Sequence, residues 1–223
     1  MRDRYQAVLL PLSALLLLAG CSAVGPDYAP PSQPLPISFG EPTAELGTGA
    51  VEVEWWRTFD DPALTALVQQ ALAANHDIGI AAMRLEEAKA RQRESYRGAI
   101  DAAWELDLFG RVRRSVEAAQ AQTGSREALL REVQVSVIAT VAATWFELRG
   151  IEAEIAVVTD ISQSQRESLK LVEQQVNAGS ASEFDRLRAE ALLRNVEVAM
   201  PELERRRAAS INALAILLGT VPQ

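Results

Sequence analysis

Few side chains in this sequence could carry out chemistry. The chain has one cysteine, Cys21, and one histidine, His76. The sequence contains no glycine-rich phosphate-binding loop and no group of His, Cys, Asp and Glu at metal-ligand spacing. A single histidine at an expected helix break is far more often a surface residue than a ligand or a base. We therefore expect no catalytic residue, no cofactor and no metal, and we do not expect an enzyme.

Cys21 is the residue with the clearest chemical role. It closes the string Leu18-Ala19-Gly20-Cys21, which follows a basic start and an apolar stretch too short to span a bilayer comfortably. This is the pattern of a bacterial lipobox, in which the cysteine is acylated and begins the mature chain; the alternative is an ordinary signal peptide with a chance cysteine. We interpret residues 1–20 as a lipoprotein signal peptide and Cys21 as the lipidation site. Ser22 is not an acidic inner-membrane retention signal, so we expect anchoring in outer-membrane lipid.

Composition and charge restrict the possible partners. The net charge is −8 and aromatic residues make up only 5% of the chain. An acidic chain without a large basic stripe is a poor binder of nucleic acid, and we interpret the run Arg205-Arg206-Arg207 as a solvated helix face. Residues 21–53 are rich in Pro and Gly, which predicts an extended linker after the lipidated cysteine.

The elements that would position any functional surface are helices. From residue 137 onward the apolar positions advance by four and three residues alternately, which is a heptad and predicts a coiled-coil seam. The seam positions are Val137, Val141, Thr144, Leu148, Ile151, Ile155, Val158, Ser162, Gln165, Leu169, Val172 and Val176. No proline lies between Pro62 and Pro201, so residues 111–176 are predicted to form one long helix.

A tight turn is predicted to join this helix to a second helix that runs back along it. The turn is Asn177-Ala178-Gly179-Ser180, where Gly179 can adopt the left-handed conformation that ends helices. Ser182 is expected to cap the return helix, with Asp185 completing a capping box. Pro201 is expected to kink the return helix, which Gly219 and Pro222 end.

Two shorter helices are predicted within residues 54–97. Asp61 suits the cap of the first helix and Pro62 its first position. The string Asn75-His76-Asp77 is expected to break it, with Asp77 capping the next helix, which continues to about Tyr96. We predict a mainly α fold with a single helical domain over residues 54–223.

Residues 102–109 follow a different period. Trp104, Leu106 and Leu108 alternate with Glu105 and Asp107, which is typical of a β-strand with one apolar and one acidic face. Such a strand would suit a barrel wall between lipid and water. An extended corner leading into the helix after Gly110 explains the spacing equally well.

These motifs together resemble the outer-membrane factor family, the outer-membrane efflux channel subunits of tripartite pumps, in its lipoprotein branch. The string Trp104-Glu105-Leu106-Asp107-Leu108-Phe109-Gly110-Arg111 is similar to the most specific motif of that family. Supporting matches are Trp56, Phe59, Asp61-Pro62, Leu64, Leu67, Ala71, Asn75 and Asp77, the turn from Asn177 to Asp185, and the closing Leu214-Ala215-x-Leu217-Leu218-Gly219.

The resemblance implies a trimeric tunnel whose subunits have two tandem halves, each with a β-hairpin and long periplasmic helices. It implies that the turn with Asn177, Ala178, Gly179, Ser180, Ser182 and Asp185 contacts a periplasmic adaptor protein, which links the tunnel to an inner-membrane pump. The sequence departs from the family in two respects: residues 98–103 are too few for a membrane strand, and the second half is absent. At most one strand, near Trp104 to Phe109, is therefore expected.

Three functions are compatible with these features. The first is a subunit of an outer-membrane efflux channel, lipid-anchored, with its helices in the periplasm. The second is a lipid-anchored helical interaction protein that forms no pore. The third, a periplasmic adaptor, is disfavoured because such a protein would need β-rich segments beside the hairpin and none follows Leu218.

Overall fold

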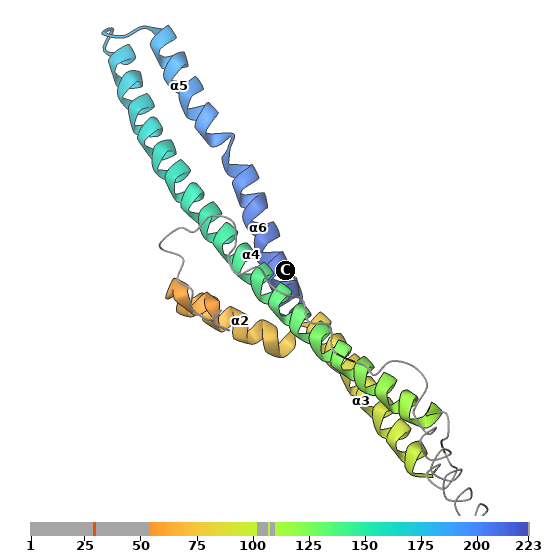
Figure 1. Ribbon diagram of the computed structural model, residues 1–223. Helices are drawn as coiled ribbons and strands as arrows, with labels where there is room; N and C mark the ends of the chain where they lie inside the picture. Colours follow the sequence, from red (N-terminus) through yellow and green to blue (C-terminus); the bar gives the residue numbers. More distant parts are fainter. Residues whose placement is uncertain (1–28, 30–53, 102–106, 108–109, 223) are drawn as a thin grey trace, which may run out of the picture. The chain divides into compact units, whose positions relative to one another are not determined.

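The computed structural model describes residue 29, residues 54–101, residue 107 and residues 110–222. Within these residues the chain forms a short 3-10 helix and a series of α-helices (Figure 1). The elements are η1 (Trp55–Phe59), α2 (Pro62–Ala74), α3 (His76–Asp101), α4 (Arg111–Asn177), α5 (Glu183–Glu197) and α6 (Met200–Leu217). The described residues contain no strand, and the predicted mainly α class is confirmed.

Several sequence predictions fall on residues outside this set. They are the signal peptide, Cys21, nearly all of the linker over residues 21–53, and the strand near Trp104 to Phe109, of which only Asp107 is described. The predicted helix over residues 111–176 is confirmed as α4, which is 67 residues long.

The chain divides into two compact units, and each is described on its own. The first contains Gly79–Val133, and the second contains Val53–Ile78 and Gln134–Gln223. In the first unit, most of α3 lies beside the beginning of α4, and Gln120 Nε2 donates a hydrogen bond to the Tyr96 hydroxyl. Leu85, Ala88 and Thr123 are buried there.

In the second unit, Asp61 begins α2 and also ties it to α4. One carboxylate oxygen accepts hydrogen bonds from the backbone N–H groups of Ala63 at 2.8 Å and Leu64 at 3.1 Å, which confirms the predicted cap. The other oxygen accepts a hydrogen bond of 2.8 Å from the indole Nε1 of Trp145 in α4. The Arg149 guanidinium lies 5.8 Å from the centre of the same indole ring. The cap therefore also joins two helices that are 84 residues apart in sequence.

The residue that caps α3 is Asn75, and the prediction that Asp77 caps it is wrong. The Asn75 side-chain oxygen accepts hydrogen bonds from the backbone N–H groups of Asp77 at 3.0 Å and Ile78 at 3.2 Å. The reason is that α3 begins at His76, one residue before Asp77, so the cap position falls on Asn75. The Asn75 amide nitrogen also donates to the carbonyl of Leu217 at 2.9 Å, at the end of α6.

The predicted heptad seam is confirmed by burial along α4. Every seam position from Val137 to Val176 is buried or half-buried, and Val141 and Ile151 are almost completely buried. Leu193 in α5 and Leu203 and Leu214 in α6 are buried as well. A 4-3 pattern keeps one stripe of a helix facing its partner, which explains why the sequence located this stripe correctly.

The return helix is interrupted rather than simply kinked at the predicted place. Backbone hydrogen bonding of α5 ends with Val198 N donating to Arg194 O at 3.0 Å, and that of α6 begins with Leu203 N donating to Ala199 O at 3.2 Å. Pro201 is the second residue of α6. Because proline has no N–H, it cannot donate to the carbonyl of Glu197, and the two helices are separate.

Candidate functional site: the hairpin tip and its two edges

The tip of the hairpin is a tight turn stabilised by its own backbone. Gly179 has φ of 73°, and its N–H donates to the carbonyl of Val176 at 2.9 Å. The N–H of Ser180 donates to the carbonyl of Gln175 at 2.8 Å. This pair of bonds is the Schellman motif, so the predicted left-handed role of Gly179 is confirmed. A Cβ at Gly179 would meet nothing within 4 Å, and the requirement for glycine is therefore conformational and not steric.

The capping box of α5 directly follows this turn. Asp185 N donates to Ser182 Oγ at 3.3 Å, and Ser182 N donates to a carboxylate oxygen of Asp185 at 3.0 Å. Hydrogen bonds from the Ser182 hydroxyl and then from its backbone N–H lower the pKa of Asp185. A hydrogen bond from Arg186 likewise lowers the pKa of Glu183. Two carboxylates are thus held ionised at the N-terminus of α5, where the helix dipole favours negative charge.

The turn presents little apolar surface, but the first turns of α5 present a large amount. Asn177, Ala178, Gly179, Ser180, Ser182 and Asp185 are all exposed. Phe184 is 72% exposed and Leu187 is 51% exposed. Neither residue was predicted from the sequence to form a surface. The sequence signal that identifies them is their spacing: they are three residues apart, and this places them together on a different face of α5 from the buried Leu193.

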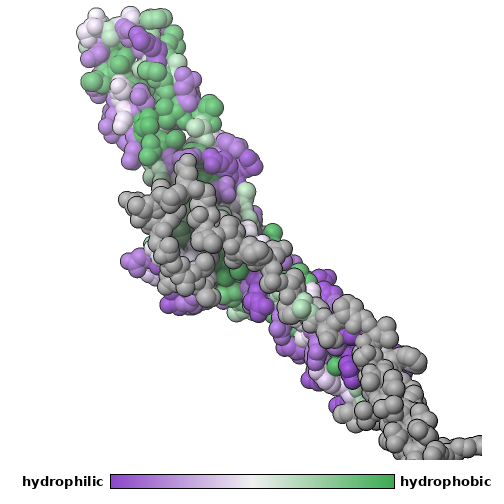
Figure 2. Space-filling view, in the orientation of Figure 1, coloured by the Kyte–Doolittle hydropathy of each residue, from purple (hydrophilic) through white to green (hydrophobic). Residues whose placement is uncertain are grey.

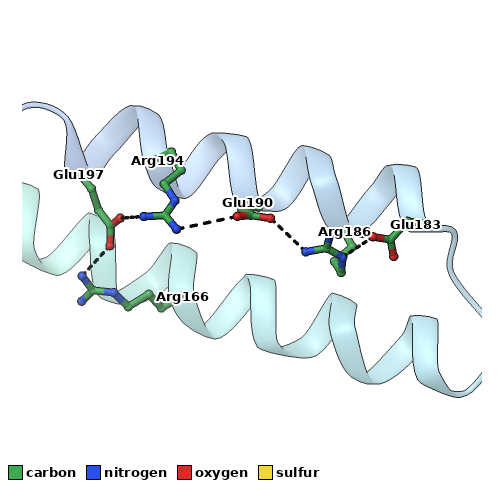
Figure 3. A network of polar contacts seen from close by, with 6 residues as sticks. All are labelled: Arg166, Glu183, Arg186, Glu190, Arg194 and Glu197. Carbon is green, nitrogen blue, oxygen red and sulfur yellow. Dashed lines mark hydrogen bonds and ion pairs between the residues drawn. The ribbon is translucent and has the colours of Figure 1, made fainter.

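A row of ion pairs runs along one edge of the hairpin (Figure 3). Along α5, Arg186 bridges Glu183 at 2.6 Å and Glu190 at 3.0 Å, and this raises the pKa of Arg186. Arg194 lies 3.9 Å from Glu190 and 3.7 Å from Glu197.

Only the last pair of this network crosses between the two helices. Arg166 of α4 contacts Glu197 at 2.7 Å. Charged residues beside a heptad seam favour one register of two helices, and Arg166 with Glu197 is a pair of this kind.

The arginine run in α6 has the same role. Arg206 contacts Glu154 at 3.3 Å and Arg207 contacts Glu152 at 3.4 Å, both on α4. Arg205 pairs with Glu202 within α6 at 2.6 Å. The run is therefore partly exposed, as expected, but two of its members also join α6 to α4.

The other edge of the hairpin is apolar and open. A groove of about 550 Å³ runs between α4 and the junction of α5 with α6. Its wall includes Gly150, Ala153, Val157, Val158, Ala199 and Leu203. Figure 2 shows hydrophobic residues gathered along the hairpin of α4 and α5, with hydrophilic residues at its margins. An exposed apolar surface of this kind marks a candidate contact surface.

Three members of the Trp104 motif are described, Asp107, Gly110 and Arg111, and they lie at the start of α4. Asp107 accepts hydrogen bonds from the backbone N–H groups of Val112 at 3.1 Å and Arg113 at 3.2 Å. Gly110 is buried with φ of 73°, and its N–H donates to the Asp107 carbonyl at 3.2 Å. Trp104, Glu105, Leu106, Leu108 and Phe109 lie outside the described residues. Part of the motif therefore caps the N-terminus of α4.

Among the described residues, no group of His, Cys, Asp and Glu is arranged to hold a metal ion. His76, at the first position of α3, is exposed.

Comparison with known proteins gives consistent results. The profile of the family described as outer membrane efflux protein matches residues 89–220. The solvent efflux pump outer membrane protein SrpC of Pseudomonas putida is 30% identical over 253 residues, covering 95% of this chain and 53% of that protein. The probable outer membrane lipoprotein SilC of Salmonella typhimurium is 24% identical, covering 97% of this chain and 54% of that protein.

A solved structure of the outer-membrane channel OprN aligns with a TM-score of 0.74 at 29% identity, over 89% of this chain and 52% of that one. This chain thus spans about half the length of the curated relatives that it matches.

Proposed function

Because the chain belongs to the outer membrane efflux protein family, we propose that it is a subunit of an outer-membrane efflux channel. This family is non-enzymatic. In this proposal Cys21 carries the lipid, the helices of residues 54–223 lie in the periplasm, and the tip faces an adaptor protein of a tripartite pump. The relatives named for solvent efflux and as a lipoprotein support the transport role and the lipid anchor respectively.

The observation that carries the proposal is the apolar surface that the α4–α5 hairpin leaves uncovered after its own seam is closed. On α5, Phe184, Leu187 and Ala191 are exposed and share one face because they are spaced by three and four residues. Val198, directly after α5, is exposed as well. On α4, Val157, Ile161 and Leu171 are exposed beside the buried seam. Helices that are apolar on more than one face pack against more than one neighbour. Such a hairpin suits the wall of a tube built from several hairpins, a trimer in a complete family member.

The tip also suits a docking role. Its turn and capping box satisfy the polar groups of the backbone locally, so the turn does not need a partner to be ordered. Phe184 remains 72% exposed directly beside this ordered turn. A rigid turn next to an exposed aromatic residue favours contact with an apolar site on an adaptor, since little conformational entropy is lost on binding.

A second candidate, a lipid-anchored interaction protein without a pore, is supported by the length of one connection. Only residues 102–109, eight residues, lie between the end of α3 at Asp101 and Gly110. A membrane strand needs roughly 9–11 residues, so this connection cannot hold a β-hairpin. Natural barrels have at least about eight strands, and an open sheet edge is not tolerated in lipid. We expect this chain alone to form no pore.

Conductance across planar bilayers separates the two candidates. The purified, lipidated chain is added to a bilayer alone and then together with a full-length relative. We expect no openings from the chain alone. Discrete, reproducible openings at low concentration would show that it forms a channel by itself and would overturn the no-pore expectation.

Crosslinking in cells tests the tip. A photoreactive residue at position 184 is expected to capture an adaptor protein in a cell that carries a pump, and Gly179→Val is expected to weaken this capture several-fold. Gly124→Val is the matched control, because Gly124 lies within α4 and a Cβ there meets nothing within 4 Å. If residue 184 captures no adaptor, or if both valine variants behave alike, the tip is not the docking site.

A further inference from the structure

The return helix is interrupted at the same level as the polar part of the α4 seam. The register follows from the contact of Arg166 with Glu197 at 2.7 Å. One helical turn back along α4 from Arg166 is Ser162, and one turn onward from Glu197 is Pro201, because the two helices are antiparallel. Ser162 therefore lies level with the interruption over residues 198–201.

Ser162 is an unusual residue for that position. It is 4% exposed, and its hydroxyl has no hydrogen-bond partner among the described residues. Other hydroxyls of α4 donate to carbonyls one turn earlier, as Thr159 does to Ile155 at 2.7 Å and Ser164 to Asp160 at 3.1 Å. A buried hydroxyl without a partner weakens the packing around it. Gln165, half-buried, is the next seam residue, so the apolar seam is interrupted between Val158 and Leu169.

The helical hydrogen bonding of the backbone is interrupted at the same level. Pro201 leaves the carbonyl of Glu197 without its helical donor, and Val198 is 77% exposed, so little packing holds the interruption from outside. The apolar groove of about 550 Å³ has Ala199 and Leu203 on one wall and Val157 and Val158 on the other. It provides free volume into which the junction can move.

From these three coincident features we infer that residues 198–201, opposite Ser162 and Gln165, form a hinge. The hinge divides the hairpin into a tip segment, which is α5 with residues 166–177 of α4, and a base segment, which is α6 with residues 134–158 of α4. The contact of Arg166 with Glu197 holds the helices together on the tip side of the hinge, and that of Arg206 with Glu154 does so on the base side. At the hinge, α5 separates from residues 166–177 of α4 while α6 stays packed on residues 134–158. This inference goes beyond the proposed function and does not depend on pore formation.

Amide hydrogen exchange on the full, lipidated chain tests the hinge, since it reports local opening segment by segment. We expect amides of α5 to exchange at least tenfold faster than those of α6. Replacing the buried hydroxyl by a larger apolar group that can fill the adjacent free volume, Ser162→Val, is expected to slow exchange in α5 at least threefold and to leave α6 unchanged. Pro201→Ala, which restores the missing N–H, is expected to act in the same direction.

Ser164→Val is the matched control, because Ser164 lies on the same helix but is exposed. It is expected to leave exchange in both segments unchanged. Ser162→Ala, which removes the hydroxyl without adding volume, serves if the valine variant loses helical circular dichroism. The hinge is refuted if α5 and α6 exchange at the same rate, or if they slow together in Ser162→Val. It is also refuted if neither Ser162 variant changes exchange in α5.

Discussion

At the scale of single residues, two glycines end helices in the same way but in different surroundings. Gly219 has φ of 67°, its N–H donates to Ile216 O, and Thr220 N donates to Ala215 O, which repeats the hydrogen bonding at Gly179. Ser180 and Thr220 add a side-chain hydrogen bond to the same carbonyls, each at 3.0 Å. The surroundings differ, because a Cβ at Gly219 would lie 2.3 Å from the carbonyl oxygen of Ala74.

This difference predicts unequal costs for the same substitution. Gly179→Ala is expected to destabilise the hairpin by about 1–2 kcal/mol, the cost of a left-handed conformation with a Cβ. Gly219→Ala is expected to cost more, because the added methyl group also forces α6 away from α2. Thermal unfolding followed by circular dichroism measures both. Equal decreases in melting temperature would contradict the close approach at Ala74.

Asp61 predicts a dependence of stability on pH. Hydrogen bonds from the Trp145 indole and then from Leu64 N lower the pKa of Asp61 in the folded chain. The folded state therefore binds the proton less readily than the unfolded state, and the stabilisation is present above the unfolded pKa of about 3.9. It is lost as the pH falls through the folded pKa. Asp61→Asn is expected to reduce this loss of stability in acid.

Urea unfolding between pH 3 and pH 7 measures the effect. Asp60→Asn is the matched control, because Asp60 is exposed and asparagine tolerates its φ of 49°. Trp145→Phe removes the donor and is expected to reproduce the effect of Asp61→Asn in part. If the free energy of unfolding of Asp61→Asn decreases toward pH 3 as much as that of the unchanged protein does, the hydrogen bond does not contribute to stability.

At the scale of elements, Asn75 connects three helices through one side chain. Its oxygen caps α3, its nitrogen donates to the end of α6, and it directly follows α2. The side chain is only 7% exposed, so water does not readily replace these bonds. An amide is required, because one atom must accept and the other must donate.

Two substitutions separate these roles. Asn75→Ala is expected to cost about 2 kcal/mol, since it removes a cap and leaves the Leu217 carbonyl without its donor. Asn75→Asp keeps the cap but places a carboxylate beside that carbonyl, so its cost is expected to fall as the pH is lowered and the carboxylate protonates. Chemical unfolding at pH 7 and pH 4 distinguishes them. A cost for Asn75→Asp that does not change with pH would show that the contact with Leu217 is unimportant.

At the scale of the whole molecule, Cys21 is proposed to decide where the helices act. A single acyl chain anchors a protein only marginally, whereas two or more hold it stably. Cys21→Ser is therefore expected to abolish incorporation of a clickable fatty acid and to move the protein from the membrane fraction to the soluble fraction. Labelling and fractionation of cells measure both. Equal labelling of the two forms would show that Cys21 is not the acylation site.

Local features of the helices were predictable from sequence because their causes are local. Asp61 before Pro62, Gly179 at the turn and the capping box of Ser182 with Asp185 each depend on residues within one turn of each other. The heptad seam was predictable because a 4-3 pattern implies a buried stripe whatever the partner is. The family resemblance was also recognised from short contiguous motifs.

Tertiary structure decided what depends on residues far apart in the chain. The hydrogen bond from Trp145 to Asp61 and that from Asn75 to Leu217 join residues 84 and 142 positions apart. Neither has a periodic signal in the sequence. The position of Ser162 opposite the interruption near Pro201 depends on the antiparallel register of α4 and α5, which the cross-helix pair of Arg166 with Glu197 shows. Whether an apolar residue such as Phe184 is buried depends likewise on which faces of α5 other helices pack against. Burial is therefore a property of the packed helices together and not of a single helix.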